Sequence, residues 1–217
     1  MATLLLRLAA PLQSWGCGSK FNIRNTEREP TKSGVIGMIA AAMGIQRNDD
    51  SKKLEPLCRL RYGVRVEKEG KLLKDFHMVH EYKNGEISNS HITERYYLSD
   101  AVFLAALEAD SSAYLEEIVH ALNNPVYPLF LGRRSCPVTL PVVIDICEDE
   151  LVDALKKATP LVKDVNKSKR IVYEAYDGGT VVQDVPISFS QLHRIHGYRY
   201  KKEFMHSIVE HDPMAEL

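Results

Sequence analysis

Four basic side chains lie between two apolar stretches near the start of the chain: Lys20, Arg24, Arg28 and Lys32. The small residues Ser33 and Gly34 follow, where an apolar helical pattern begins. Arg and Lys bind phosphate oxygens through charge-assisted hydrogen bonds, and the free N–H groups of a helix N-terminus favour anions. The spacing therefore predicts a phosphate-binding loop, although a solvated basic surface loop fits it equally well.

A second pair of cations, Arg133 and Arg134, follows Gly132 after an apolar stretch. The planar guanidinium group of Arg offers parallel donors to a phosphate, and a glycine turn can place such a side chain at the edge of a sheet. The pattern favours a second phosphate contact at this turn. Ion pairs with carboxylates that close the fold are the alternative.

The single Trp of the chain, Trp15, stands between Ser14 and Gly16 in the loop after the first apolar stretch. An indole ring can stack on a nucleotide, insert between subunits or anchor the packing of a core. A lone Trp favours the packing role slightly over stacking.

Metal and redox chemistry have little support in the residue spacing. The four cysteines include no C-x-x-C pair, so reduced thiols are expected. The pairs His77/His80 and His193/His196 each have three-residue spacing in segments that we expect to be extended, where such side chains face opposite sides. We therefore predict neither a metal site nor a cofactor.

The first strand and helix must position the basic loop. Leu4–Ala9 is predicted as a buried strand, and apolar residues at three- and four-residue steps predict a helix that opens at Ser33. Thr31 or Ser33 can cap this helix. Gly34 and Gly37 lower its propensity, which indicates a close approach of the backbone to the sheet or to a ligand.

The rest of the chain reads as further strands and helices around a polar, projecting segment at His80–Thr93. We expect strands at Leu60–Val66, Leu72–Val79, Tyr96–Leu107 and Val138–Ile146, and a helix at Ser111–Leu122. This β-α-β-hairpin-β-α-β order predicts an α+β fold of the ferredoxin-like, RRM-like kind. Residues 148–217 are predicted to be small and mainly β, with a short helix at Glu148–Lys157 and strands at Ile171–Tyr176, Val181–Val185 and Ile195–Tyr200.

Charge is distributed unevenly along a chain whose net charge is −1. Residues 1–65 hold 11 Lys and Arg against 5 Asp and Glu, whereas the remainder holds 17 against 24. This pattern fits a local anionic ligand better than strong non-specific binding to nucleic acid. No run of 18 apolar residues and no secretory signal pattern is present, so we expect a cytoplasmic protein without a membrane partner.

Three blocks of the sequence resemble a known family. Leu4–Gly16 followed by Pro30–Gly37 and Met43–Asp49 is similar to the N-terminal signature of the CRISPR-associated CasD (Cas-five) proteins. Tyr127–Pro137 and Arg95–Ala101 resemble later segments of the same family, in the same order. These proteins are RAMP-superfamily subunits of type I Cascade complexes, and the type I-E branch is the most similar.

The resemblance implies a non-catalytic subunit that binds the 5′ handle of CRISPR RNA in an antiviral ribonucleoprotein. Such a subunit caps the filament of backbone subunits and seats the large subunit, so it meets target DNA only indirectly. It also implies a RAMP ferredoxin-like domain at residues 1–147, with a projecting thumb at about 77–97, and a separate C-terminal region at 148–217. No RNP-type aromatic motif is present, so we expect recognition of phosphates and shape.

The residues that we expect to bind RNA are basic or lie at the helix start: Lys20, Arg24, Arg28, Lys32, Ser33, Gly34, Arg133 and Arg134. Lys83, His91 and Arg95 are expected to make the contacts of the thumb with RNA or with a neighbouring subunit.

Two other functions stay open at the level of sequence. A metal-independent endoribonuclease that processes CRISPR repeat RNA, as in the type I-C branch, would use a Tyr-Lys-His set. Here the helix after the basic loop has no Tyr and His91 has no adjacent Lys, so that set cannot be placed. A protein-only adaptor, whose basic loop binds a neighbouring subunit, is the other alternative.

Overall fold

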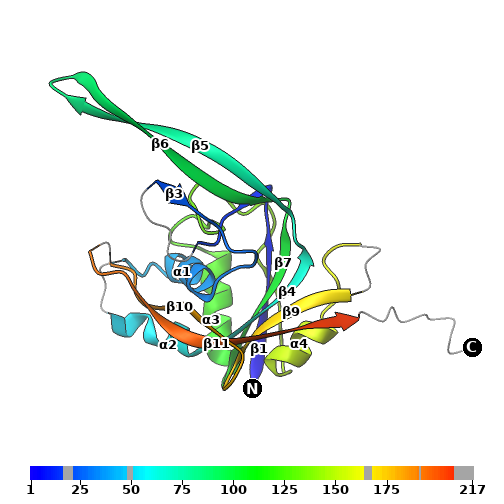
Figure 1. The fold of residues 1–217 in the computed structure, drawn as a ribbon. Helices are drawn as coiled ribbons and strands as arrows, with labels where there is room; N and C mark the ends of the chain where they lie inside the picture. The colour runs from blue at the N-terminus through cyan, green and yellow to red at the C-terminus, as the bar shows by residue number, and fades with distance from the viewer. Residues whose placement is uncertain (17–21, 48–50, 164–167, 191, 208–217) are drawn as a thin grey trace, which may run out of the picture.

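The computed structural model describes residues 1–16, 22–47, 51–163, 168–190 and 192–207. Its centre is a seven-stranded sheet in the order β10-β11-β9-β4-β7-β1-β8, in which all neighbours are antiparallel (Figure 1). The bounds are β1 Ala2–Ala9, β4 Arg61–Lys68, β7 Val102–Ala109, β8 Val143–Cys147, β9 Ser168–Ala175, β10 Thr180–Ser188 and β11 Ile195–Ser207.

Helices cover both faces of this sheet because its central strands are apolar on both sides. Leu4, Leu6 and Leu8 of β1 lie in one core with α1 (Lys32–Ala42) and α3 (Ser112–Asn123). Leu5 points the other way and packs with α4 (Leu151–Lys157). The 3-10 helix η1 (Ser51–Lys53) and α2 (Glu55–Arg59) lead into β4. Within the described residues, no helix is long and apolar enough to span a membrane.

The start of α1 agrees with the expected cap. Thr31 has an extended backbone, and its Oγ1 accepts a hydrogen bond from the N–H of Gly34 at 3.2 Å. α3 likewise begins after Ser111, whose hydroxyl accepts from Ala113 N–H. Both helices carry the apolar positions that the spacing predicted, and local capping explains why their first residues were predictable.

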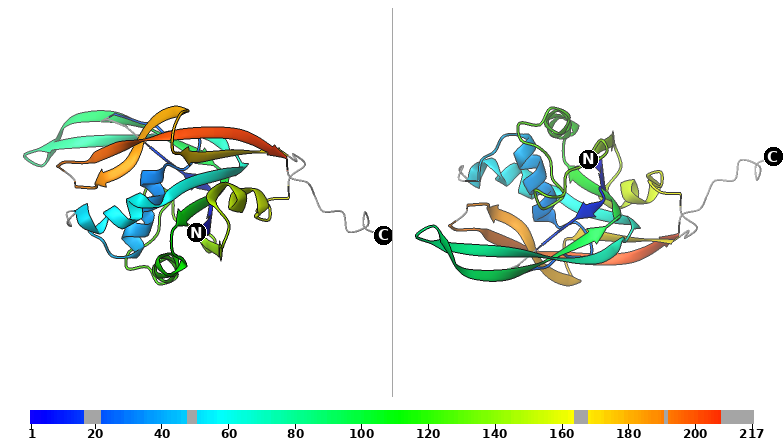
Figure 2. Two further views of the ribbon diagram at one scale, coloured as in Figure 1. Left: turned by 90° about the horizontal axis from the view of Figure 1, so that it is seen from below. Right: turned by 90° about the horizontal axis from the view of Figure 1, so that it is seen from above.

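A second, four-stranded sheet is built around the long hairpin of β5 (Lys71–Lys83) and β6 (Glu86–Ser99). The short strands β2 (Leu12–Gln13) and β3 (Ile23–Arg24) pair with the base of β6. Asn84 and Gly85 both have positive φ at the hairpin tip, as a type I′ turn requires. The hairpin extends well beyond the body of the molecule (Figures 1 and 2).

Two expected strands are divided or shortened in the structure. Tyr96–Leu107 is not one strand: Asp100 has φ 55°, so the chain turns there, and the segment divides between β6 and β7 in different sheets. Apolar composition on both sides of the turn masked this break. The strand expected at Val138–Ile146 begins only at Val143, and the preceding stretch makes a single bridge between Phe130 and Pro137.

The C-terminal strands join the main sheet. β9 pairs with β4 through Gly63↔Tyr173, Val64↔Val172 and Arg65↔Ile171, and β11 and β10 continue outward from β9. The mainly β character of this region is as predicted. The domain boundary at residue 147 stays a prediction, and the backbone hydrogen bonds run continuously across it.

Candidate nucleic-acid interface

A pocket of about 300 Å³ brings together residues from the two basic segments of the sequence. Arg24 approaches from β3, Ser33 and Gly34 from the start of α1, and Arg133 from the turn after Gly132. Arg194, which precedes β11, also lines this pocket. The tertiary structure therefore assembles a polar hollow with three arginines at the N-terminal end of α1.

Trp15 forms one wall of the pocket and is a packing anchor. Its side chain is 1% exposed, and Nε1 donates a hydrogen bond to Gln13 Oε1 at 3.0 Å. A Cβ atom on Gly34 would lie 2.8 Å from Cε3 of the indole ring. The close backbone approach expected at Gly34 is thus an approach to Trp15, and the ring face on that side is covered.

The turn that carries Arg133 is locked in place by its neighbours. Gly132 has φ +88°, and any Cβ atom there would overlap the Ser14 carbonyl group. The Arg133 guanidinium lies 4.7 Å from the centre of the Tyr97 ring, and Nη2 donates to the Arg24 carbonyl oxygen at 2.6 Å. Nη1 is buried without a hydrogen-bond partner in the part of the chain that the structure describes.

A larger groove of about 800 Å³ adjoins this pocket and shares Ser33, Gly34, Gly132 and Arg194 with it. The exposed Arg134 lines the groove, as do Arg47 after α1 and the aromatic rings of Tyr127, Phe130 and Phe189. Sequence reasoning missed Arg47 and Arg194 as members of the site. Arg47 lies in a block that resembles the family, whereas no local signal marks Arg194.

Lys32 is a correction to the sequence prediction. Its side chain is 2% exposed, and Nζ forms an ion pair with Glu174 Oε2 at 2.8 Å. Its backbone N–H donates to Asp184 Oδ2 at 2.9 Å. A cation held in this way is not available to phosphate, so we do not expect Lys32 to bind RNA.

The N–H groups at the start of α1 are also partly occupied. Asp184 accepts from Lys32 N–H, and Thr31 accepts from Gly34 N–H. A phosphate would have to displace these acceptors to bind the two N–H groups, and the contact at the helix N-terminus stays a prediction. Ser33 is largely buried, with its Oγ 3.4 Å from Thr31 Oγ1, and it contributes to the pocket as a wall residue.

Arg24 and Arg28 remain at the surface. Arg28 pairs with Glu69 at 3.1 Å, and both side chains are more than half exposed. Exposed pairs of this kind contribute little to stability, so a phosphate can replace the carboxylate at small cost. Lys20 lies outside the described residues.

The three hairpin residues do not converge on one point. Arg95 lies at the base, where it pairs with Arg24 in the parallel β3–β6 ladder. His91 is further along β6, with Nε2 3.3 Å from Glu81 Oε1, and Lys83 is at the tip beside the turn. Only Arg95 is therefore next to the pocket.

The hairpin has two chemically different faces because side chains alternate along its strands. Asp75, His77 and Glu81 share one face with their partners Arg95 and His91. The opposite face carries large apolar side chains, each more than half exposed: Leu72, Phe76, Met78, Tyr82, Ile87 and Ile92. The separation is partial, because the Lys74–Glu94 ion pair lies on this second face and the exposed Leu73 and Val79 lie on the first. The polar face is continuous with the Arg24–Arg133 pocket through Arg95 and Tyr97.

The site offers little for covalent or metal chemistry. Burial raises the pKa of the Cys136 thiol near the turn, and burial likewise raises the pKa of Cys58. No group of three or more His, Cys, Asp or Glu that could hold a metal gathers among the described residues. What the arrangement can do is bind anions with fixed guanidinium groups.

Arginines that line a polar hollow on an α/β sheet define a candidate nucleic-acid-binding protein, and comparison with known proteins narrows the class. The family model described as CRISPR-associated protein (Cas_Cas5) matches residues 3–201. The chain is 35% identical over 160 residues to the CRISPR system Cascade subunit CasD of Escherichia coli (strain K12). The aligned residues make up 67% of this chain and 71% of that protein.

Two solved structures are similar over nearly the whole chain. A chain of a CRISPR RNA-guided surveillance complex has TM-score 0.78 and 33% identity, covering 95% of this chain and 90% of its own. A crystal structure of a Cas protein has TM-score 0.76 and 36% identity, covering 97% of this chain and 100% of its own. The chain belongs to the CRISPR-associated Cas5 family, as the three sequence blocks predicted.

Proposed function

We propose that this protein is the non-catalytic subunit that binds the CRISPR RNA 5′ handle in a type I-E-like Cascade complex. The observation that carries the proposal is the convergence of arginines from separate segments on two adjoining hollows beside α1. Arg24, Arg133, Arg134, Arg47 and Arg194 line these hollows. The similarity to a subunit of Cascade and to a chain of an RNA-guided complex supports the same assignment.

The geometry favours phosphate recognition with a few bases held individually. Arg133 is fixed by Tyr97 and by the Arg24 carbonyl group, so it loses little side-chain entropy when a phosphate binds. Arg24 and Arg134 are exposed and can follow the path of the backbone. The aromatic rings of Tyr127 and Phe130 in the adjoining groove are suitable partners for unstacked bases.

The fold supports a RAMP domain of the ferredoxin-like kind. The strands β8-β1-β7-β4 are adjacent in that order, with α1 between β1 and β4 and α3 between β7 and β8. This is the β-α-β-β-α-β arrangement. We assign the β5–β6 hairpin to the thumb, its polar face to the RNA and its apolar face to the neighbouring backbone subunit.

Capping of the backbone filament and seating of the large subunit belong to the same proposal. The exposed apolar face of the hairpin is the surface that we assign to the filament, because such side chains are costly to leave in water. Target DNA would be reached through the large subunit.

A salt titration of RNA affinity tests the phosphate site. The probe is a fluorescein-labelled single-stranded RNA copied from the 5′ end of the host CRISPR RNA, and the readout is anisotropy. Arg133→Ala should lower affinity and flatten the log–log salt dependence by about 0.7, the value for one phosphate contact on a single strand. Arg59→Ala is the matched control, because Arg59 is an exposed cation on α2 that pairs with Glu55.

A cleavage assay and the affinities of the variants separate RNA binding from the two alternatives. Incubation of the protein with repeat RNA in EDTA should leave the RNA uncut. A defined cut that His91→Ala abolishes would instead support the endoribonuclease. No binding at low salt would support the protein-only adaptor. Binding that Arg133→Ala and Arg24→Ala leave unchanged would show that RNA binds elsewhere on the protein.

A further inference from the structure

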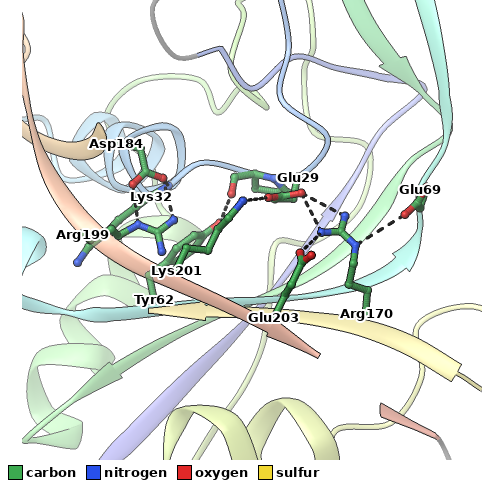
Figure 3. Close-up of polar contacts among 10 residues, drawn as sticks. Glu29, Lys32, Tyr62, Glu69, Arg170, Asp184, Arg199, Lys201 and Glu203 are labelled. Atoms are coloured by element: carbon green, nitrogen blue, oxygen red, sulfur yellow. Dashed lines mark hydrogen bonds and ion pairs between the residues drawn. The ribbon is translucent and has the colours of Figure 1, made fainter. Parts of the chain in front are cut away.

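The segment that connects the exposed arginines to α1 is held by the C-terminal strands, through contacts far apart in sequence. Glu29 lies between Lys201 of β11 and Arg170 of β9 (Figure 3). Its Oε1 accepts from Lys201 Nζ at 2.8 Å, and its Oε2 accepts from both terminal nitrogens of Arg170 at 3.1 Å. The Glu29 side chain is 13% exposed, so these contacts are mostly shielded from water.

The residues that follow Glu29 are tied to β4, β9 and β10. The Pro30 carbonyl oxygen accepts from the Tyr62 hydroxyl group of β4 at 2.7 Å. Lys32 contacts Glu174 of β9 through its side chain and Asp184 of β10 through its backbone. Asp184 is in turn held by Arg199 of β11 through two hydrogen bonds of 2.6 and 2.8 Å (Figure 3).

The other end of the basic segment is anchored separately. Glu27 N–H donates to the Trp15 carbonyl oxygen at 2.7 Å, and Trp15 N–H donates to Thr26 Oγ1 at 2.9 Å. Arg28 therefore lies between a Trp15 anchor on one side and Glu29 on the other. The Glu29 contacts hold the chain on the C-terminal side of Arg28.

We infer that Glu29, Arg170 and Lys201 form an ionic clasp that positions Arg28 and the adjoining loop for RNA, which makes β9 and β11 part of the binding apparatus. The inference rests on the proposed function for its RNA readout. Glu29 is a positioning residue: it is an anion, it touches no proposed phosphate site, and it acts through the path of the chain.

The direction in which one substitution changes RNA affinity distinguishes a positioning role from general electrostatics. Glu29→Gln removes a negative charge close to the proposed RNA site, so electrostatics alone predicts tighter binding. The clasp predicts weaker binding, because an amide has a single acceptor oxygen and must turn its N–H donors toward either Lys201 or Arg170, which releases the loop. We expect RNA affinity to fall about tenfold, because the ionised carboxylate that joins the loop to both β9 and β11 is lost.

Glu203→Gln is the matched control. Glu203 contacts the same Arg170 at 3.2 Å, but its side chain is 56% exposed and its ion pair is with Arg170 rather than with the loop. The change in charge is identical, and affinity should stay within about twofold of the wild type. Unchanged or tighter binding by Glu29→Gln, or an equal loss in both variants, would overturn the clasp.

Two further measurements keep the test decisive. If Glu29→Gln does not fold, Glu29→Asp keeps the charge but shortens the reach, and undiminished affinity of that variant would refute the inference. If the wild type binds no RNA, the proposed function fails. Amide hydrogen exchange then tests independently whether the clasp holds the loop. Exchange at residues 26–32 should then be about tenfold faster in Glu29→Gln than in Glu203→Gln. Equal exchange would count against the clasp.

Discussion

Cations on the two sides of Glu29 have opposite surroundings, although they belong to one basic run in the sequence. Arg24 and Arg28 lie at the surface, and the Glu69 carboxylate that pairs with Arg28 is itself exposed. Lys32, four residues beyond Arg28, is 2% exposed and paired with Glu174. The first two can exchange a partner for phosphate, whereas the third holds α1 against β9.

The difference shows how burial assigns a role to a charge. A buried ammonium group has lost its water and needs a partner with good geometry, and Lys32 finds one in Glu174. An exposed guanidinium group keeps most of its hydration, so its ion pair contributes little and is easily replaced. Sequence shows only that both cations are present.

Lys32→Ala should have the largest effect, and it should act on stability. The substitution leaves the Glu174 carboxylate without its cation, and we expect the free energy of unfolding to fall by about 3 kcal/mol. Urea denaturation followed by circular dichroism measures this. The salt slope of RNA binding by the folded fraction should not change, and a slope reduced by about 0.7 would restore Lys32 to the phosphate site.

Arg24→Ala should act in the opposite way, on RNA and not on stability. Its side chain is exposed, so the free energy of unfolding should change by less than about 0.5 kcal/mol. The log–log salt slope of RNA affinity should flatten by about 0.7. Anisotropy titrations at three salt concentrations, beside urea denaturation, provide both values. A stability loss as large as that of Lys32→Ala would show that Arg24, like Lys32, has a structural role.

Glu69→Gln should give a smaller gain in RNA affinity. Glu69 competes with phosphate for Arg28, and its removal frees that guanidinium group. We expect affinity to rise about twofold at low salt, with the gain disappearing as salt screens the charges. The same titration in Arg28→Ala is the control, because Glu69→Gln should then have a reduced effect.

The pH dependence of the clasp should be smaller still and has a defined sign. Burial alone would raise the pKa of Glu29, but Lys201 and Arg170 outweigh it and hold the pKa below its ordinary value of 4.5. A carboxyl group with a depressed pKa in the folded state stabilises the fold above the unfolded pKa and loses that contribution as the pH falls through the folded value.

Wild type and Glu29→Gln should therefore differ in stability at pH 7 and converge below about pH 4.5. Urea midpoints measured between pH 7 and pH 3 check this. A difference that grows toward low pH would show that Lys201 and Arg170 do not hold the ionised carboxylate.

Elements with strong local signals were predicted well. Neighbouring residues alone determine three of these features: the apolar run of β1, the Thr31 cap of α1 and the Ser111 cap of α3. The turn at Asp100 was missed because apolar residues continue on both sides of it. The family was also evident, since its blocks are short and contiguous.

The site was predictable only in part, because its contacts are long-range. Arg133 was expected from its turn, and the structure brings it to Arg24 across 109 positions. Lys32 was misassigned because Glu174 and Asp184 lie 142 and 152 positions away. Arg194 has no local motif at all.

The amino-acid sequence by itself determined the family, the main helices and the supply of cations near the start of the chain. Only the tertiary structure decided which cations face solvent, because burial and pairing depend on strands that come last in the chain. The charge of a lysine or arginine is fixed by its chemistry, but its availability to phosphate depends on its loss of water and on the carboxylates that the fold places beside it.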